Sequence, residues 1–235
     1  MSDILGAIEK EREYLSYRMK NEEPFHLVDA VKEFGFESLK EYFDAKRDYL
    51  FSQLRFEVVE ATAPEAIGVI QSTLTQGKTA LLFAKTDFTL VWNGNGGSVN
   101  EEYCTECGIP IYPYYTGGGT IVSTAGDLNI GICYSQNDLL DSRYILKKFA
   151  DLFRKYTNKA VLISGNDLLV GGIKMLGSAT YLKNGMFMFV TSVSLSEKEE
   201  LISAICEKHS TKQPGHIDFI DADTLRQEVE QWQGQ

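Results

Sequence analysis

The apolar residues of the first 55 positions recur at a spacing close to that of a helix. Between residues 4 and 19 they are interleaved with Glu, Lys and Arg, which predicts an amphipathic helix. A second helical run is predicted over residues 25–34. After Gly35, Ser38 is placed to cap a third helix whose apolar face carries Leu39, Tyr42, Phe43, Tyr49 and Leu50. Residues 1–55 are therefore predicted to form a helical extension.

The pattern changes at residues 55–61, where apolar and charged residues alternate as in a half-buried strand. A second domain is therefore predicted over residues 56–235. Its expected helices lie near 64–74, at 101–108 and at 140–156. Ser196 with Glu199 is predicted to form a capping box for a further helix, and Asp223 to cap a last helix that ends near Trp232. Strands are predicted over 80–84, 88–92, 109–112, 120–122 and 128–134, with two strand pairs within 160–193.

This order of elements, with strands clustered centrally and helices between and after them, predicts an α+β fold: a mixed β-sheet with flanking helices. The formal net charge of −10 and the interleaving of basic with acidic residues argue against a nucleic-acid partner. No apolar run reaches the roughly 18 residues needed to span a bilayer, and the start has no charged and then apolar leader. Four cysteines do not make a disulfide framework. We therefore expect a cytoplasmic protein with reduced thiols and no membrane partner.

Two segments are candidates for chemistry. Lys174 lies between tight turns and apolar runs, which makes it a candidate clamp for an anion, although a solvated lysine in a hairpin has the same pattern. About fifty residues upstream, the run Thr116-Gly117-Gly118-Gly119-Thr120 offers main-chain amides that no side chain shields. This run lacks the ending of a nucleotide P-loop, so a flexible hairpin or bulge remains an alternative.

Taken together, these segments resemble motifs of the lipoate-protein ligase and octanoyltransferase family. Residues 108–111, 116–122 and 126–130 follow the order of that family's glycine-rich loop, turn and Asn-containing strand. Residues 165–170 resemble its Gly-Arg-Asn-Asp motif. Residues 174–179, Lys-Met-Leu-Gly-Ser-Ala, resemble its Lys-Ile-Ser-Gly-Ser-Ala motif. The resemblance covers roughly residues 60–220 and implies the fold shared by class II synthetases and biotin and lipoate ligases.

The resemblance also implies a function and a site. The function is activation of lipoate or octanoate with ATP and Mg²⁺, followed by transfer to a lysine of a lipoyl-domain carrier protein. Lys174 is the implied catalytic residue, since in the family it contacts the acyl carboxylate and the adenylate phosphate. The resemblance implies that Asn166 holds substrate and that Asp167 holds magnesium or adenine, and no metal-ligating set of residues is expected. The implied substrate-binding residues are Tyr114, Tyr115, Thr116, Gly117, Gly118, Gly119, Asn166, Asp167, Gly177, Ser178 and Ala179.

The chain departs from the family pattern at three places. Pro113-Tyr114-Tyr115 stands where the family has Arg-Arg, Ser123-Thr124 replaces His-Asp, and Gly165 replaces an arginine. The arginine guanidinium groups of the family pattern, which this chain lacks, would have bound phosphate. A non-catalytic member that binds a small acyl ligand or a partner protein is therefore one alternative.

An octanoyltransferase acting from an acyl carrier is the other alternative, and it requires a nucleophilic cysteine at the pocket. No cysteine lies near Lys174 in the sequence or in the strands that follow. Cys104 and Cys107 form an isolated C-x-x-C pair, which is a weak signal for zinc or redox chemistry.

Overall fold

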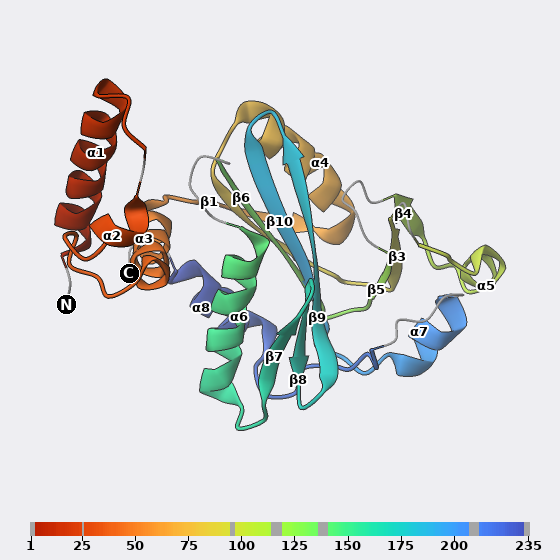
Figure 1. Ribbon diagram of the computed structural model, residues 1–235. Coiled ribbons are helices and arrows are strands. Elements are labelled where there is room, and N and C mark those ends of the chain that lie inside the picture. Colours follow the sequence, from red (N-terminus) through yellow and green to blue (C-terminus); the bar gives the residue numbers. More distant parts are fainter. Residues whose placement is uncertain are drawn as a thin grey trace. The chain divides into compact units, whose positions relative to one another are not determined.

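The computed structural model describes residues 3–24, 26–94, 97–113, 119–135, 141–206 and 212–232. The chain divides into two compact units, one within the first 54 residues and the other spanning Arg55–Trp232 (Figure 1).

The first unit contains three helices: α1 (Ile4–Lys20), α2 (Leu27–Ala30) and α3 (Leu39–Gln53). The Ser38 side chain accepts a hydrogen bond from the Glu41 amide, so the predicted cap of the third helix is confirmed. The second helix is shorter than predicted. After Ala30 the chain makes turns whose hydrogen bonds span three residues, and Gly35 follows at a φ of 93°, a conformation that ends a helix.

The second unit holds the sheets. Its helices are α4 (Ala63–Gln76), α5 (Glu101–Glu106), α6 (Ser142–Tyr156), α7 (Glu199–Ile205) and α8 (Ala222–Glu230). Its strands are β1 (Glu57–Thr62), β2 (Ala80–Lys85), β3 (Leu90–Asn93), β4 (Ile111–Pro113), β5 (Thr120–Ser123), β6 (Leu128–Ser135), β7 (Val161–Ser164), β8 (Asp167–Val170), β9 (Ile173–Lys183) and β10 (Met186–Val193). The predicted strand pairs within 160–193 are thus β7–β8 and β9–β10.

Seven strands form one mixed sheet in the order β1-β2-β6-β10-β9-β8-β7, in which β1 and β2 are parallel and the other neighbours antiparallel. A smaller sheet has the order β4-β3-β5. The predicted α+β fold with a mixed sheet and flanking helices is therefore confirmed.

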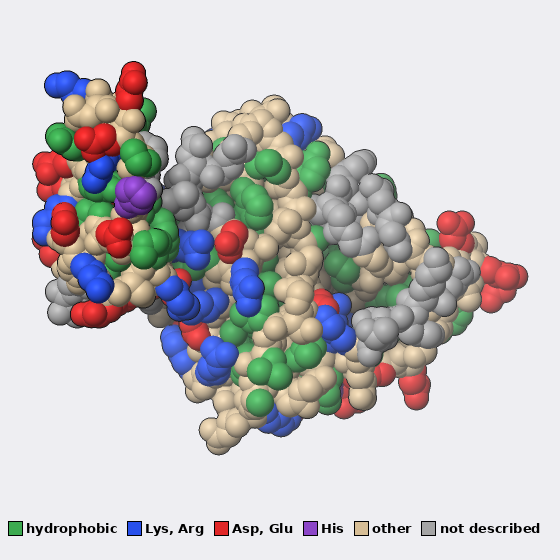
Figure 2. Space-filling model, viewed as in Figure 1, with side chains coloured by type: hydrophobic (Ala, Val, Ile, Leu, Met, Phe, Trp, Pro, Cys, Tyr) green, Lys and Arg blue, Asp and Glu red, His purple; other side chains and the backbone are tan. Residues whose placement is uncertain are grey.

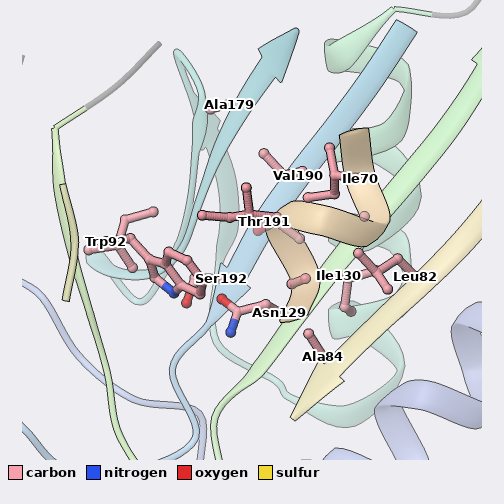
Figure 3. Close-up of a pocket in the computed structure, with 14 residues that line it drawn as sticks. Ile70, Leu82, Ala84, Trp92, Asn129, Ile130, Ala179, Val190, Thr191 and Ser192 are labelled. Carbon is pink, nitrogen blue, oxygen red and sulfur yellow. The ribbon is translucent and has the colours of Figure 1, made fainter. Parts of the chain in front are cut away.

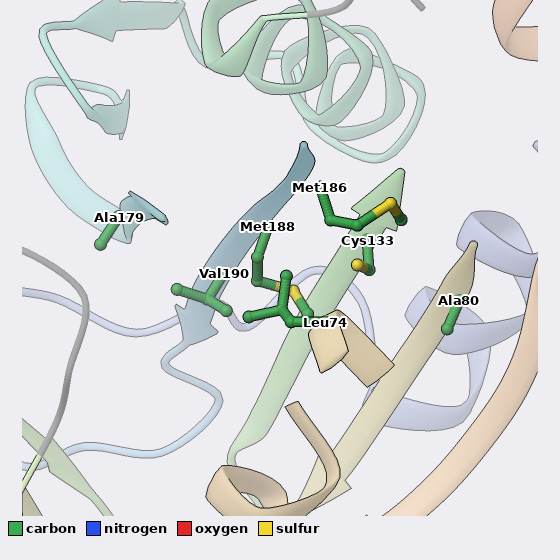
Figure 4. Packing of buried hydrophobic residues seen from close by; sticks show 7 residues of the cluster. All are labelled: Leu74, Ala80, Cys133, Ala179, Met186, Met188 and Val190. Carbon is green, nitrogen blue, oxygen red and sulfur yellow. The ribbon is translucent and has the colours of Figure 1, made fainter. Parts of the chain in front are cut away.

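Helices cover both faces of the large sheet. Met188 and Phe189 are neighbours in β10, so their side chains point to opposite faces. Met188 packs in one buried cluster with Leu74 of α4 (Figure 4), whereas the Phe189 ring stacks on Phe149 of α6 at 6.2 Å. Burial on both faces explains why β2, β6 and β10 are nearly continuous apolar runs.

Two predicted helix caps are wrong. Lys198, and not Ser196, precedes α7, because the Ser196 hydroxyl is engaged by Thr124 and Asp127. Asp221, and not Asp223, caps α8, since its carboxylate accepts from the amide and the hydroxyl of Thr224. The helix α7 therefore has no side-chain cap, and at α8 the cap is not the carboxylate nearest in sequence to the apolar run.

Candidate functional site

A cleft of about 650 Å³ opens in the second unit, beside strands of both sheets. Gly119 and Lys174, which belong to the two segments that the sequence singled out, both line it. The lining is completed by parts of β5, β8, β9, β10 and α7 and by residues 212–215. The predicted convergence of Lys174 and the end of the glycine-rich run on one cleft is therefore observed.

A β-bulge directs Lys174 into this cleft. Asp167 of β8 pairs with Gly177 of β9, and Leu169 pairs with Lys174, so Met175 and Leu176 lie where a regular ladder would place one residue. Because side chains alternate along a strand, an extra residue moves those beyond it to the other face. The bulge thus puts Lys174 on the same side as Asp167.

Asp167 is an ion-pair partner of two lysines. Its Oδ1 lies 2.9 Å from Lys174 Nζ, and its Oδ2 lies 2.5 Å from Lys212 Nζ. Burial by itself would raise the pKa of Asp167, but hydrogen bonds from Lys212 and Lys174 outweigh burial and lower that pKa below its ordinary value. The carboxylate is therefore ionised at neutral pH, and the three groups carry one net positive charge.

Gly177 leaves room for the Lys174 side chain. A Cβ atom at this position would lie 3.1 Å from both Cε and Nζ of Lys174. The Lys174 backbone is held in turn by residues 213–215, since its amide donates to the Gln213 carbonyl and its carbonyl accepts from the Gly215 amide, both at 2.9 Å. The lysine is thus fixed at its backbone and unobstructed at its tip.

The other predicted residues in β9 and in the turn before β8 either hold these strands together or line the cleft. The Ser178 hydroxyl and amide both donate to the Asn166 carbonyl, at 2.8 and 2.9 Å, which joins the β7–β8 turn to β9. Asn166 is exposed and lines the cleft with Gly177, Ser178 and Ala179. The predicted residues Tyr114, Tyr115, Thr116, Gly117 and Gly118 lie outside the described residues.

An apolar recess adjoins the cleft. It lies between α4, the large sheet and Trp92 of β3 (Figure 3). Ile121, Ala179 and Ser192 line both the recess and the cleft, so the two spaces adjoin at these residues. The recess has a volume of about 30 Å³. It must therefore widen before an acyl chain can enter it.

A buried ion pair, which the sequence analysis did not single out, borders the cleft. Lys198 lines the cleft and pairs with Asp127, whose side chain is 0% exposed. Asp127 also accepts hydrogen bonds from the Thr124 and Leu195 amides, at 2.8 and 2.9 Å. Burial lowers the pKa of Lys198, although the attraction of Asp127 offsets part of that effect. The pair joins the turn before β6 to the segment before α7.

The sequence profile of the lipoyl protein ligase A/B catalytic domain matches residues 88–231, which is more than half of the chain. The chain belongs to this family. The match includes the strands and helices that line the cleft and leaves the helical extension outside.

Solved structures of lipoate-protein ligases share the fold. A bipartite lipoate protein ligase of Thermoplasma acidophilum, studied with its E2 lipoyl domain, is 19% identical, with a TM-score of 0.63 over 77% of this chain and 82% of that chain. P. falciparum LipL1 in complex with lipoate is 12% identical, with a TM-score of 0.64 over 74% of this chain and 60% of that chain. A lipoate-protein ligase A bound with ATP is 18% identical, with a TM-score of 0.59 over 77% and 83%. No curated protein sequence matches the chain.

A cysteine at the site would distinguish an octanoyltransferase of this family from a ligase, and the structure brings one to the cleft. The sequence placed no cysteine near Lys174, but Cys206 at the end of α7 lines the same cleft, because α7 folds back beside β5. Burial, with a smaller contribution from Cys104, raises the pKa of the Cys206 thiol. Burial also raises the pKa of Cys133, to about 11. Both thiols are therefore protonated at neutral pH, which disfavours them as nucleophiles.

Magnesium, which the family resemblance implies, does not fit the side chains described at this cleft. Both oxygens of Asp167 are engaged by lysine ammonium groups, which compete with a divalent cation. Across the described parts of the chain, no group of three or more His, Cys, Asp and Glu residues is arranged to hold a metal ion.

Charged side chains are unevenly spread over the surface. On the face of the second unit seen in Figure 2, acidic residues gather near α5 and α7, and Lys and Arg side chains gather over α6. The exposed basic residues of this helix are Arg143, Lys147, Arg154 and Lys155.

Within the described ranges, no helix has both the length and the apolar character needed to cross a bilayer.

Proposed function

We propose that this protein activates lipoate or octanoate with ATP and transfers the acyl group to a lysine of a lipoyl-domain carrier protein. The observation that carries the proposal is the shared cleft, which is lined by both Lys174 and Gly119, the last glycine of the glycine-rich run. Membership of the lipoyl ligase family supports the reaction class, and related structures hold lipoate or ATP.

The reaction has two steps. A carboxylate oxygen of the acid attacks the α-phosphorus of ATP, pyrophosphate leaves, and an acyl adenylate forms. The amine of the carrier lysine then attacks the acyl carbonyl, an amide bond forms, and AMP leaves. In the first step negative charge builds on the α-phosphate oxygens, and in the second it builds on the acyl carbonyl oxygen; the Lys174 ammonium group would stabilise both. No step is assigned to a magnesium ion.

The cleft and its recess suit an acid with an apolar tail. The carboxylate would lie near Lys174, and the tail would extend past Ala179 and Ile121 toward Ile70 and Leu82. Each methylene buried there contributes about 0.8 kcal/mol to binding. An eight-carbon acid therefore gains most of its affinity from the recess once the side chains around it move apart.

A non-catalytic role as a binding module is the second candidate. The observation that favours it is Pro113 at the end of β4, which begins the segment 113–115 that stands where the family has Arg-Arg, because a proline supplies no donor for phosphate. Such a protein would bind the acid without activating it.

Acid-dependent exchange between ATP and radiolabelled pyrophosphate tests the proposal. The wild-type protein should catalyse exchange only when lipoate or octanoate is present, and Lys174→Ala should slow it by at least about 100-fold. Lys78→Ala, which alters a lysine outside the cleft that pairs with Glu57, is the matched control and should leave exchange unchanged.

Three other outcomes would count against parts of this account. Saturable binding of the acid without exchange would favour the binding module. Wild-type exchange by Lys174→Ala would refute the role of that lysine. Acyl transfer that needs no ATP and is abolished by iodoacetamide would favour a cysteine-dependent octanoyltransferase.

A further inference from the structure

The two lysines that share Asp167 are held differently. Lys212 Nζ also donates to the Ser164 carbonyl at 2.7 Å, so it has a second acceptor on the scaffold. For Lys174, Asp167 is the only side chain among the described residues to which an ion pair is formed. Both lysines line the cleft, but the Lys174 tip lies against Gly177, where no side chain limits its movement. Of the two, Lys174 is the one that can turn toward a ligand.

Turning Lys174 toward a ligand has a cost that Lys212 can offset. The Asp167 side chain is only 17% exposed, so it is poorly solvated without a cationic partner. With Lys212 in place at 2.5 Å from Oδ2, Asp167 keeps an ammonium group after Lys174 leaves. Without Lys212, a substrate carboxylate would compete with Asp167 for a single lysine.

We propose that Lys212 is a positioning residue: it neutralises Asp167 and so releases Lys174 to bind the carboxylate of the acyl substrate. This inference rests on the proposed function, and it adds that Lys212 is the residue that makes Lys174 available to the substrate. The released lysine brings one positive charge to a substrate with one negative charge. Lys212 itself stays on Asp167 and the Ser164 carbonyl.

Titration calorimetry of octanoate binding to the full-length protein, without ATP, tests this role. Lys212→Met should weaken binding by about tenfold or more, because Asp167 then retains Lys174. Lys212→Arg keeps the positive charge and should bind within about threefold of wild type. Lys78→Met is the control for loss of a surface lysine and should bind as wild type does. Thermal unfolding of each variant shows that the fold is retained.

A double variant, read together with thermal unfolding, tests whether Lys212 acts through Asp167. Lys212→Met combined with Asp167→Asn removes the competing carboxylate together with its partner, so binding should return to within about threefold of wild type. A structural role of Lys212 would be rescued by the same second substitution, but it would also lower the melting temperature of Lys212→Met in parallel with its affinity, whereas a positioning role lowers the affinity of a variant that melts close to wild type.

The outcomes have distinct meanings. Wild-type affinity in Lys212→Met would overturn the inference while leaving the proposed function intact. A double variant that binds no better than Lys212→Met would also overturn it, because Lys212 would then not act through Asp167. Failure of the wild-type protein to bind octanoate or lipoate would refute the proposed function, and this inference with it.

Discussion

At the scale of single residues, the site depends on what surrounds one ammonium group. Lys174 is ordinary as a side chain, and its setting gives it a role: a bulge at Met175, an acidic partner at Asp167 and an absent side chain at Gly177. These three features act on the same few atoms. A change at any of them should therefore alter binding of an anion without altering the lysine itself.

Gly177 offers the clearest test at this scale. A valine there would push the Lys174 tip away, since even a Cβ atom would lie 3.1 Å from Nζ. Gly177→Val should weaken octanoate binding by roughly tenfold in calorimetry, and Gly177→Ala by less. Thermal unfolding identifies variants whose fold is damaged. Equal affinity in both variants and in wild type would mean that Lys174 does not need this space.

At the scale of elements, the cleft depends on contacts between segments far apart in the chain. The buried pair of Asp127 and Lys198 joins the turn before β6 to the segment before α7, across 71 residues. Removing one partner of such a pair leaves an uncompensated buried charge, whereas neutralising both avoids that cost. The pair is thus expected to hold α7, and with it one wall of the cleft.

Urea unfolding measures this contribution. Asp127→Ala should lower the free energy of unfolding by about 3–5 kcal/mol, because Lys198 loses its counter-ion and two backbone amides lose their acceptor. The double variant Asp127→Asn with Lys198→Met should recover part of the loss, since no charge is left buried and the one side-chain oxygen of asparagine can still accept from either the Thr124 or the Leu195 amide. If Asp127→Ala lowers the free energy of unfolding by less than about 1 kcal/mol, the pair does not hold α7 in place.

At the scale of the whole molecule, the sequence predicted what local patterns encode. Helical periodicity located α1, α3, α4 and α6, and the mixed sheet followed from the order of elements. Lys174 and Gly119 were expected at one cleft through the family resemblance, and both line it. The run 114–118, on which part of the predicted site rests, lies outside the described residues.

What the sequence did not predict arises from packing between distant segments. Lys212 reaches Asp167 across 45 residues, because residues 213–215 pair with Lys174 in an isolated bridge rather than in a recognisable strand. Cys206 reaches the cleft through the return of α7. No periodicity or motif marks either residue, since each owes its place to tertiary contacts.

A crystal structure of the protein with bound octanoate or lipoate tests the central claim most directly. The account predicts a carboxylate oxygen within about 3 Å of Lys174 Nζ, the tail in a widened recess near Ala179, and Asp167 still paired with Lys212. An acid bound elsewhere, or a Lys174 that stays on Asp167 while the carboxylate is held by other groups, would contradict it.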